Sequence, residues 1–262
     1  MDTERRLESD NGHRFKVQDR PLCRGYRIVV VTESHADVHF DDGTLELSLG
    51  WALGCLPNTE AEVLGLWVQP AASGNVIRDL RERGAERIAM VIDAGWPSAA
   101  AEMLSAYPRA QRAPSTEHFV RRATEPLKRR LRAAAAADLR AAISGGGEAA
   151  LLGAIQSVLP ATDQASRLGE AQQLRKSLAE LSEQDRRFVL AADRTATVLL
   201  EELARAVQRN GYFLNQDAAL EFVAKALLGA ERRMDRERAA MAAQAGTLRA
   251  ASQRCLAVSR AV

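Results

Sequence analysis

The hydrophobic period of the chain changes along its length, and this change limits the folds that it can adopt. Segments 26–33, 44–55 and 62–69 are β-branched or alternate apolar and polar residues with a period of two, as strands do. Short turns separate them, which predicts an antiparallel meander. A helical pattern over 73–84 and an apolar strand over 87–93 follow. A strand, a helix and a strand make a crossover, so the pattern predicts a mixed sheet.

The chain from Pro114 onward favours helices almost throughout. Segment 127–143 consists of strong helix formers, the glycines of 145–147 interrupt it, and helical patterns then resume. We therefore expect an α/β protein (α+β mixed) that is β-rich first and helical afterwards. Residues 1–25 are polar and show no periodicity, which predicts a mobile N-terminal leader.

Cysteine usage and hydropathy exclude several classes of protein. The three cysteines are an odd number without short spacings, which excludes a disulfide framework and a structural zinc site. No window holds 18 successive apolar residues, and the polar start lacks the apolar stretch of a signal peptide. We expect a cytoplasmic protein without membrane contact, for which the nucleoid is one place of action. Heavy use of Ala and Arg is typical of a GC-rich bacterial genome.

The net charge of +2 hides a strongly basic segment. Segment 109–132 holds eight basic and two acidic residues, a balance of +6 that leaves −4 for the rest of the chain. Such a segment on a mildly acidic body is typical of phosphate-backbone binding, and a solvated helix face is the alternative. The residues expected to contact nucleic acid are Arg121, Arg122, Lys128, Arg129, Arg130 and Arg132.

Asp93 is the most informative acidic residue. It ends an apolar strand and precedes Ala94 and Gly95, so its carboxylate is expected at the carboxyl edge of the mixed sheet, where sites are commonly built. Capping of the next helix is the alternative. A magnesium site needs a second carboxylate from a neighbouring strand, and Glu33 at the end of the first strand is the candidate.

Two other patterns allow alternative interpretations. On a strand, His35, Asp37 and His39 would share one face and could hold a metal, but without a fourth ligand they are interpreted as exposed polar residues beside a turn. Near the end of the chain, large residues recur every seven positions: Leu220, Leu227, Met234, Met241, Leu248, Cys255 and Val262. The companion coiled-coil seam is poor, which favours a helix that packs on its own domain over one that binds a partner or a second copy.

Several collinear segments resemble the Mutator-type bacterial insertion-sequence transposases. The run VLGLWVQPAASGNVIRDLRERGAERIAMVID resembles the family segment with a strand VLGLW, a helix DLRxRG and a strand that ends in the second catalytic Asp. STEHFVRR is similar to the family's Cys-x-x-His-x-x-Arg segment, and RNGYFLNQDAALEFVAKAL resembles RGSFPNDEAALKLLYLAL. The similarity runs over residues 26–232, and collinear matches are more specific than a single motif.

The resemblance implies an RNase-H-like mixed sheet core with a largely helical insertion and a long C-terminal helix. The core would comprise 26–108 and 190–232, the basic insertion 109–189, and the helical tail 233–262. In the family, two Asp and one Glu hold two divalent metal ions that activate water or a 3′-hydroxyl for attack on a DNA phosphate. Mg²⁺ would be the cofactor of an active enzyme, and an inactive protein needs none.

The chain departs from the family at most of the catalytic positions. The resemblance places the second Asp on Asp93, the first on Thr32 or Glu33, and the Glu on Thr197. Glu201 follows Thr197 by one helical turn, which displaces its carboxylate by roughly 5 Å.

The flanking motif is also altered. The Cys of the Cys-x-x-His segment is Ser115, whereas its His persists as His118. The family's long N-terminal region, which binds transposon ends, is almost wholly absent from the chain as the resemblance aligns it.

These departures lead to one main hypothesis and two alternatives. The main hypothesis is a transposase-derived, domesticated pseudoenzyme that is kept for binding DNA or for protein assembly through its C-terminal helix. The first alternative is an active metal-dependent transposase or nuclease with a shifted site of Glu33, Asp93 and Glu201. The second is an interaction subunit that does not bind nucleic acid.

Overall fold

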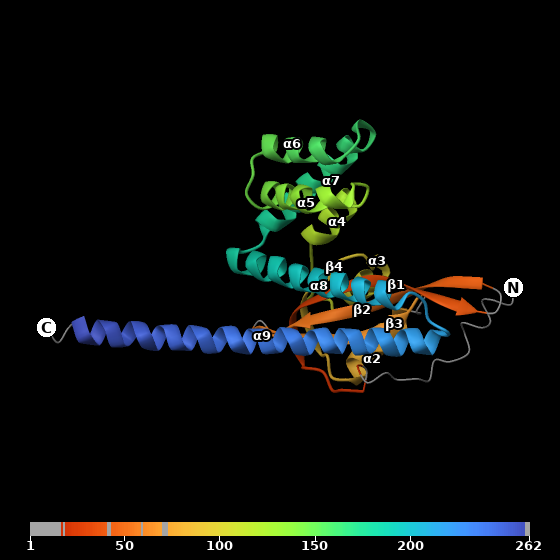
Figure 1. Cartoon of the computed structure of the whole chain (residues 1–262), viewed down its shortest axis with the longest axis horizontal. Helices are drawn as coiled ribbons and strands as arrows, with labels where there is room; N and C mark the ends of the chain where they lie inside the picture. The colour runs from red at the N-terminus through yellow and green to blue at the C-terminus, as the bar shows by residue number, and fades with distance from the viewer. Residues whose placement is uncertain (1–16, 18, 41–42, 59, 70–72, 260–262) are drawn as a thin grey trace.

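A mixed sheet forms the centre of the protein (Figure 1). The computed structural model describes residues 17, 19–40, 43–58, 60–69 and 73–259, and side chains for most of these up to residue 240. Within these residues the sheet has five strands, in the order β3-β2-β1-β4-β5. They are β1 (Gly25–Phe40), β2 (Gly43–Cys55), β3 (Ala61–Val68), β4 (Arg87–Asp93) and β5 (Gln111–Ala113).

The strand directions confirm the expected RNase-H-like core. β1, β2 and β3 are antiparallel neighbours, as their alternating pattern predicts. β4 pairs in parallel with β1, and β5 pairs in parallel with β4. The crossover from β3 to β4 contains α2 (Ser73–Glu82), the helix predicted between these strands.

Two hydrophobic layers enclose the sheet. On one face, Val29 and Val31 pack against α2 and α3 (Pro97–Ala106) in a buried cluster that includes Leu80 and Trp96. On the other face, Val30 belongs to a cluster with α4 (Thr116–Thr124), α8 (Glu183–Asn210) and α9 (Gln216–Ser259). Adjacent residues of β1 therefore lie on different faces of the sheet, under different helices.

Three helices form a further layer beyond α4 and α8 (Figure 1). They are α5 (Arg129–Ser144), α6 (Glu148–Val158) and α7 (Ala161–Glu180). Leu139, Leu151 and Leu178 are buried between them and continue the core of the α8 face. The domain boundaries expected for this helical part remain predictions.

Local residues determine where the helices of the α8 face begin and end. Ser115 Oγ accepts a hydrogen bond of 3.0 Å from the His118 amide and caps α4, and Ser182 Oγ accepts one of 3.1 Å from the Asp185 amide at the start of α8. Gly211, whose φ is +85°, ends α8, because this conformation is strained for residues with a side chain.

The described part of the expected leader packs on the core. Val17 is buried, and Arg20 Nη2 donates to the Val63 carbonyl at 2.6 Å and pairs with Glu231 of α9 at 2.8 Å. Residues 1–16 and 18 of the leader lie outside the described residues.

The long helix α9 starts on the sheet and continues beyond it (Figure 1). Leu220 and Leu227 are buried, and Met234 packs against the same core. The first part of the heptad pattern therefore packs on its own domain, as one of the two interpretations predicts. The side chains of Met241, Leu248 and Cys255, and the whole of Val262, lie outside the described residues. None of the described helices has both the length and the apolar character needed to cross a membrane.

Candidate functional site

Asp93 lies at the carboxyl end of β4, beside Val31 of β1. Its Oδ1 atom accepts backbone hydrogen bonds from Gly95 at 3.1 Å and from Trp96 at 2.9 Å. Gly95 has a φ of +124°, so the chain reverses sharply here before α3 begins. Asp93 therefore holds the turn into α3, and one of its carboxylate oxygens is already committed to backbone amides.

The two candidates for the first carboxylate position lie on opposite faces of the sheet. Thr32 is buried on the face of Val30, and its hydroxyl donates to the Ala94 carbonyl at 3.0 Å. Glu33 is the next residue of β1, so its side chain lies on the opposite face of the sheet, which is the face of Val31.

The neighbours of Glu33 agree with this placement. Its partner in β2 is Gly50, where an added Cβ would lie 2.5 Å from the Trp96 ring. The Trp96 ring belongs to the layer of α2 and α3. Glu33 and the α8 helix are therefore separated by the sheet, and the shifted site of Glu33, Asp93 and Glu201 is not brought together.

The face of α8 that carries Thr197 holds two carboxylates, one turn away on either side. Asp193 precedes Thr197 by four residues and Glu201 follows it by four. Thr197 is half-buried, Asp193 is buried, and Glu201 is exposed. At the position that the resemblance aligns with the family's Glu, Thr197 therefore supplies a neutral side chain.

Asp193 has a structural role that sequence reasoning missed. It accepts hydrogen bonds from Ser115 Oγ at 2.7 Å and from the Glu117 amide at 2.9 Å, and so it joins α8 to the start of α4. Burial raises the pKa of Asp193 to about 6, in spite of these donors. The available signal was an acidic residue on the apolar face of α8, beside Ala192 and Ala196.

The guanidinium group of Arg121 lies between the end of β4 and this face of α8. Its Nη2 atom donates to the Ala94 carbonyl at 3.2 Å and lies 2.9 Å from His118 Nδ1. Burial lowers the pKa of Arg121, whereas the carboxylates of Glu125, Asp193 and Glu201 favour its charged form. Arg121 therefore neutralises acidic groups of the site from within the fold.

His118 completes this cluster as a neutral side chain. Burial lowers the pKa of His118, and the nearby charges of Arg121 and Arg122 lower it further. A Cβ atom added at Gly95 would lie 3.2 Å from the His118 ring, so the turn after β4 packs directly on α4. His118, which the resemblance aligns with the family's His, accepts a hydrogen bond from Arg121.

The residues present do not fit the pair of divalent ions that the resemblance implies. Within the described ranges, no three side chains of His, Cys, Asp or Glu come together in a group that could hold a metal ion. Thr32 and Thr197 contribute no negative charge that could hold a divalent cation.

The structure separates the six basic residues expected to contact nucleic acid. Arg121 is engaged as described, Arg122 pairs with Glu170 at 3.2 Å, and Arg132 donates to the carbonyls of Leu127 and Glu125 at 2.8 and 2.6 Å. Lys128, Arg129 and Arg130, termed the basic group, are exposed at the start of α5 and form no ion pair with any described residue.

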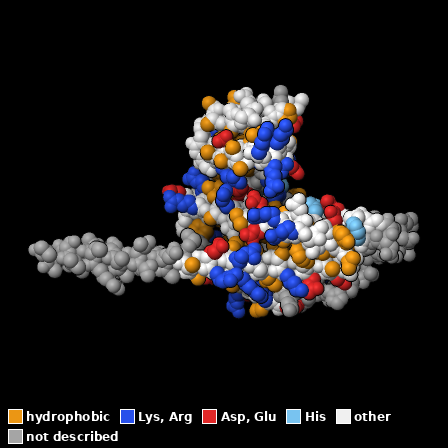
Figure 2. All heavy atoms as spheres, in the orientation of Figure 1, with side chains coloured by type: hydrophobic (Ala, Val, Ile, Leu, Met, Phe, Trp, Pro, Cys, Tyr) orange, Lys and Arg blue, Asp and Glu red, His pale blue; other side chains and the backbone are white. Residues whose placement is uncertain are grey.

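The position of the basic group works against the stability of its own helix. The N-terminus of a helix carries a partial positive charge, and cations there are unfavourable. The first turn of α5 contains no acidic residue to offset them. Figure 2 shows further Lys and Arg side chains across the helices of this face, with Asp and Glu among them. An external anion would relieve the unfavourable charge at this helix end.

The residues His35, Asp37 and His39 share one exposed face, as predicted. His35 lies 3.1 Å from Ser48 Oγ within the hairpin, whereas the strand at Asp37 and His39 joins the hairpin to the loop before α9. The His39 ring stacks on Tyr212 at 4.1 Å, and the backbone of Phe213 bonds to that of Asp37 and His39 at 2.9 and 2.7 Å. This contact could not be inferred from the spacing of the three residues.

Comparisons with known proteins give a matching family and a similar solved structure. The family model described as transposase, Mutator family, matches residues 13–233. Among solved structures, the Drosophila P element transposase strand transfer complex is similar at 9% identity, with 88% of this chain and 69% of that chain covered and a TM-score of 0.26. No match is found among the curated proteins.

Proposed function

Because the chain belongs to the Mutator family of transposases, we propose that it is a transposase-derived protein that binds DNA without cutting it. The observation that carries this proposal is that no three described side chains of His, Cys, Asp or Glu form a group that could hold a metal ion. Thr32 and Thr197, in place of carboxylates, support the same conclusion.

The basic group supports retained DNA binding. Lys128, Arg129 and Arg130 are exposed, form no ion pair with the described residues, and oppose the dipole of α5. Phosphate contacts of this kind are independent of base sequence and release counterions, so their affinity falls as salt rises. We assign to this surface a non-specific contact with the DNA backbone.

A salt titration tests the DNA-binding proposal. Binding of a labelled DNA duplex to the full chain is expected at low salt, with an affinity that falls steeply between about 50 and 200 mM salt. The variant Lys128→Gln/Arg129→Gln/Arg130→Gln should reduce the slope of log affinity against log salt by up to about 3, since each phosphate contact contributes about 0.9.

A matched control separates the basic group from general charge. Arg205→Gln/Arg209→Gln/Lys225→Gln removes three exposed cations from α8 and α9 and should leave the slope unchanged. If the wild-type chain has no affinity for DNA at low salt, the DNA-binding proposal fails. The alternative of an interaction subunit that does not bind nucleic acid then remains.

The C-terminal part of α9 is the proposed assembly element. It continues beyond the sheet (Figure 1), and its heptad spacing runs on through Met241, Leu248 and Cys255. Light scattering should give an oligomer for the full chain and a monomer for a chain ended at residue 240. The same mass for both chains would contradict the assembly role.

A further inference from the structure

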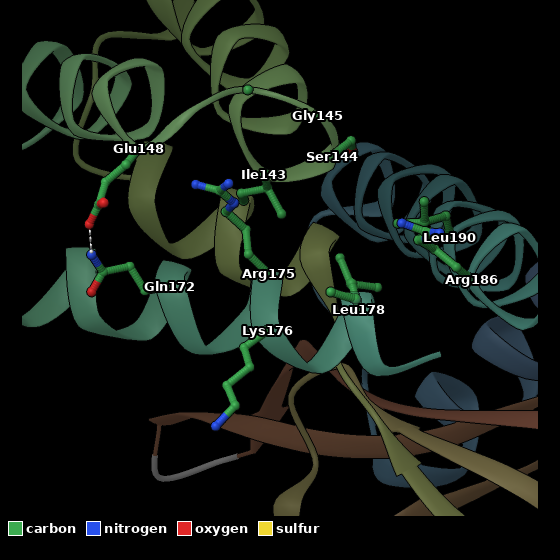
Figure 3. A pocket seen from close by; sticks show the side chains of 12 residues that line it. Ile143, Ser144, Gly145, Glu148, Gln172, Arg175, Lys176, Leu178, Arg186 and Leu190 are labelled. Carbon is green, nitrogen blue, oxygen red and sulfur yellow. Dashed lines mark hydrogen bonds between the residues drawn. The ribbon is translucent and has the colours of Figure 1, made fainter. Parts of the chain in front are cut away.

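A cavity of about 550 Å³ opens between α5, α6, α7 and α8 (Figure 3). Ile143, Leu178 and Leu190 form apolar parts of its wall, and Gly145 lines it at the end of α5. Its volume lies within the range of about 300 to 1,000 Å³ that is usual for small-ligand sites. The basic group lies at the other end of α5, roughly 20 Å away along the helix axis.

The charged side chains that line the cavity are mostly cationic. Arg175 and Arg186 are half-buried, and neither forms an ion pair with any described residue. The acidic side chain in the wall is that of Glu148, whose Oε1 accepts a hydrogen bond of 2.8 Å from Gln172. The carbonyl end of α5 adds the equivalent of about half a negative charge. The cavity therefore retains a net positive charge.

The orientation of the side chains distinguishes the cations. In Figure 3, Arg175 rises from α7 toward Ile143, whereas Lys176 points away from the cavity toward the sheet. Arg186 enters the wall from α8, beside Leu190. A half-buried guanidinium without a partner is unfavourable, and an anion bound beside it would offset this cost.

We propose that this cavity binds a nucleotide unit. The phosphate binds to Arg175, with Arg186 as the second cation, because guanidinium groups match the geometry of phosphate oxygens. The base or sugar packs against Leu190, which is only partly buried and which a lone phosphate would leave uncovered. The unit comes from a free mononucleotide or from a nucleotide of single-stranded DNA. This site is independent of the basic group and of the duplex contact assigned to it.

The test measures binding of two probes to the full chain by calorimetry at low salt. The first probe is dAMP. The second is a 12-nucleotide oligo(dT), used with Lys128→Gln/Arg129→Gln/Arg130→Gln so that the basic group does not contribute. Arg175→Gln should weaken binding about tenfold or more, as expected for loss of a charged hydrogen bond to phosphate. Arg186→Gln should weaken it as well.

Lys176→Gln is the matched control, since it removes the same charge from the next position of α7. It should change the affinity less than about twofold, given the small contribution of exposed charges. Thermal unfolding of each variant shows whether it is folded. Arg175 and Lys176 form no ion pair with the described residues, so we expect both variants to unfold near the temperature of the wild type.

Binding of dAMP that depends on Arg175 supports the proposal with a free nucleotide as ligand. Binding of oligo(dT) alone, with the same dependence, supports it with single-stranded DNA as the source. Absence of binding for both probes overturns the proposal. An equal loss of affinity in Arg175→Gln and Lys176→Gln also overturns it, because the binding would then follow overall charge.

Discussion

The guanidinium group of Arg121 donates a hydrogen bond of 3.2 Å to the carbonyl oxygen of Ala94, and this contact joins α4 to the end of β4. The same carbonyl accepts a bond of 3.0 Å from the Thr32 hydroxyl. The edge of the sheet beside Asp93 is therefore filled by donors and a positive charge. A divalent ion requires oxygen acceptors and negative charge at such a position.

Arg121 should contribute more to stability than its neighbour Arg122. Arg121→Met is expected to lower the free energy of unfolding by about 1 to 3 kcal/mol, because the Ala94 carbonyl loses a charged donor and the buried Asp193 loses a nearby cation. Arg122 pairs with Glu170 at the surface, and Arg122→Met should cost less than about 1 kcal/mol. Urea unfolding of both variants measures the difference, and equal losses would contradict the central position of Arg121.

Asp193 should make stability depend on pH in an unusual direction. Its pKa is raised to about 6 in the folded chain by burial and returns to an ordinary acidic value of 3.8 on unfolding. The folded state therefore binds more protons between these values, and stability falls as pH rises from about 4 to 6.

The comparison protein for this effect is Asp193→Asn, which lacks the titrating group. The unfolding free energy of the wild type minus that of the variant should decrease by up to about 3 kcal/mol between pH 4 and pH 7. Chemical denaturation across this range measures it. A constant difference between the two proteins would show that Asp193 is ionised throughout.

Glu117 is a buried carboxylate that two arginines stabilise unequally. Arg140 binds it at 2.8 and 2.6 Å and is mostly buried, whereas Arg194 contacts it at 3.3 Å with a side chain that is 61% exposed. Arg140→Met should therefore destabilise the protein by about 1 to 3 kcal/mol, and Arg194→Met by less than about 1 kcal/mol. Thermal or urea unfolding checks the order, and a larger loss for Arg194→Met would contradict this description of the contact.

The antiparallel meander, the mixed sheet and the place of Asp93 could be predicted because they follow from local patterns. The period of two identifies β1 to β3, and the crossover requires β4 to pair in parallel. β5 was not expected, since a strand of three residues leaves no periodic signal. The full length of β1 was also missed, because polar residues such as His35 and Asp37 alternate outward over its second half.

The side-chain contacts of the candidate site could not be predicted, because they join segments that are far apart in the sequence. Ser115 and Asp193 are 78 residues apart, and their hydrogen bond has no local signal. Glu33 was a reasonable candidate from charge alone, but the pleat places it under α3, whereas Thr32 faces α8. Arg121 was expected to contact DNA with the rest of the basic segment. Its inward orientation follows from the turn at Gly95, which brings α4 against the end of β4.

A cleavage assay tests the central claim most directly. The full chain is incubated with labelled double-stranded DNA and Mg²⁺ or Mn²⁺, alongside Asp93→Asn and an active nuclease as the positive control. We expect intact DNA with both the wild type and Asp93→Asn, because Thr32 and Thr197 supply no carboxylate for a metal pair. Cleavage by the wild type that is abolished in Asp93→Asn would contradict this account.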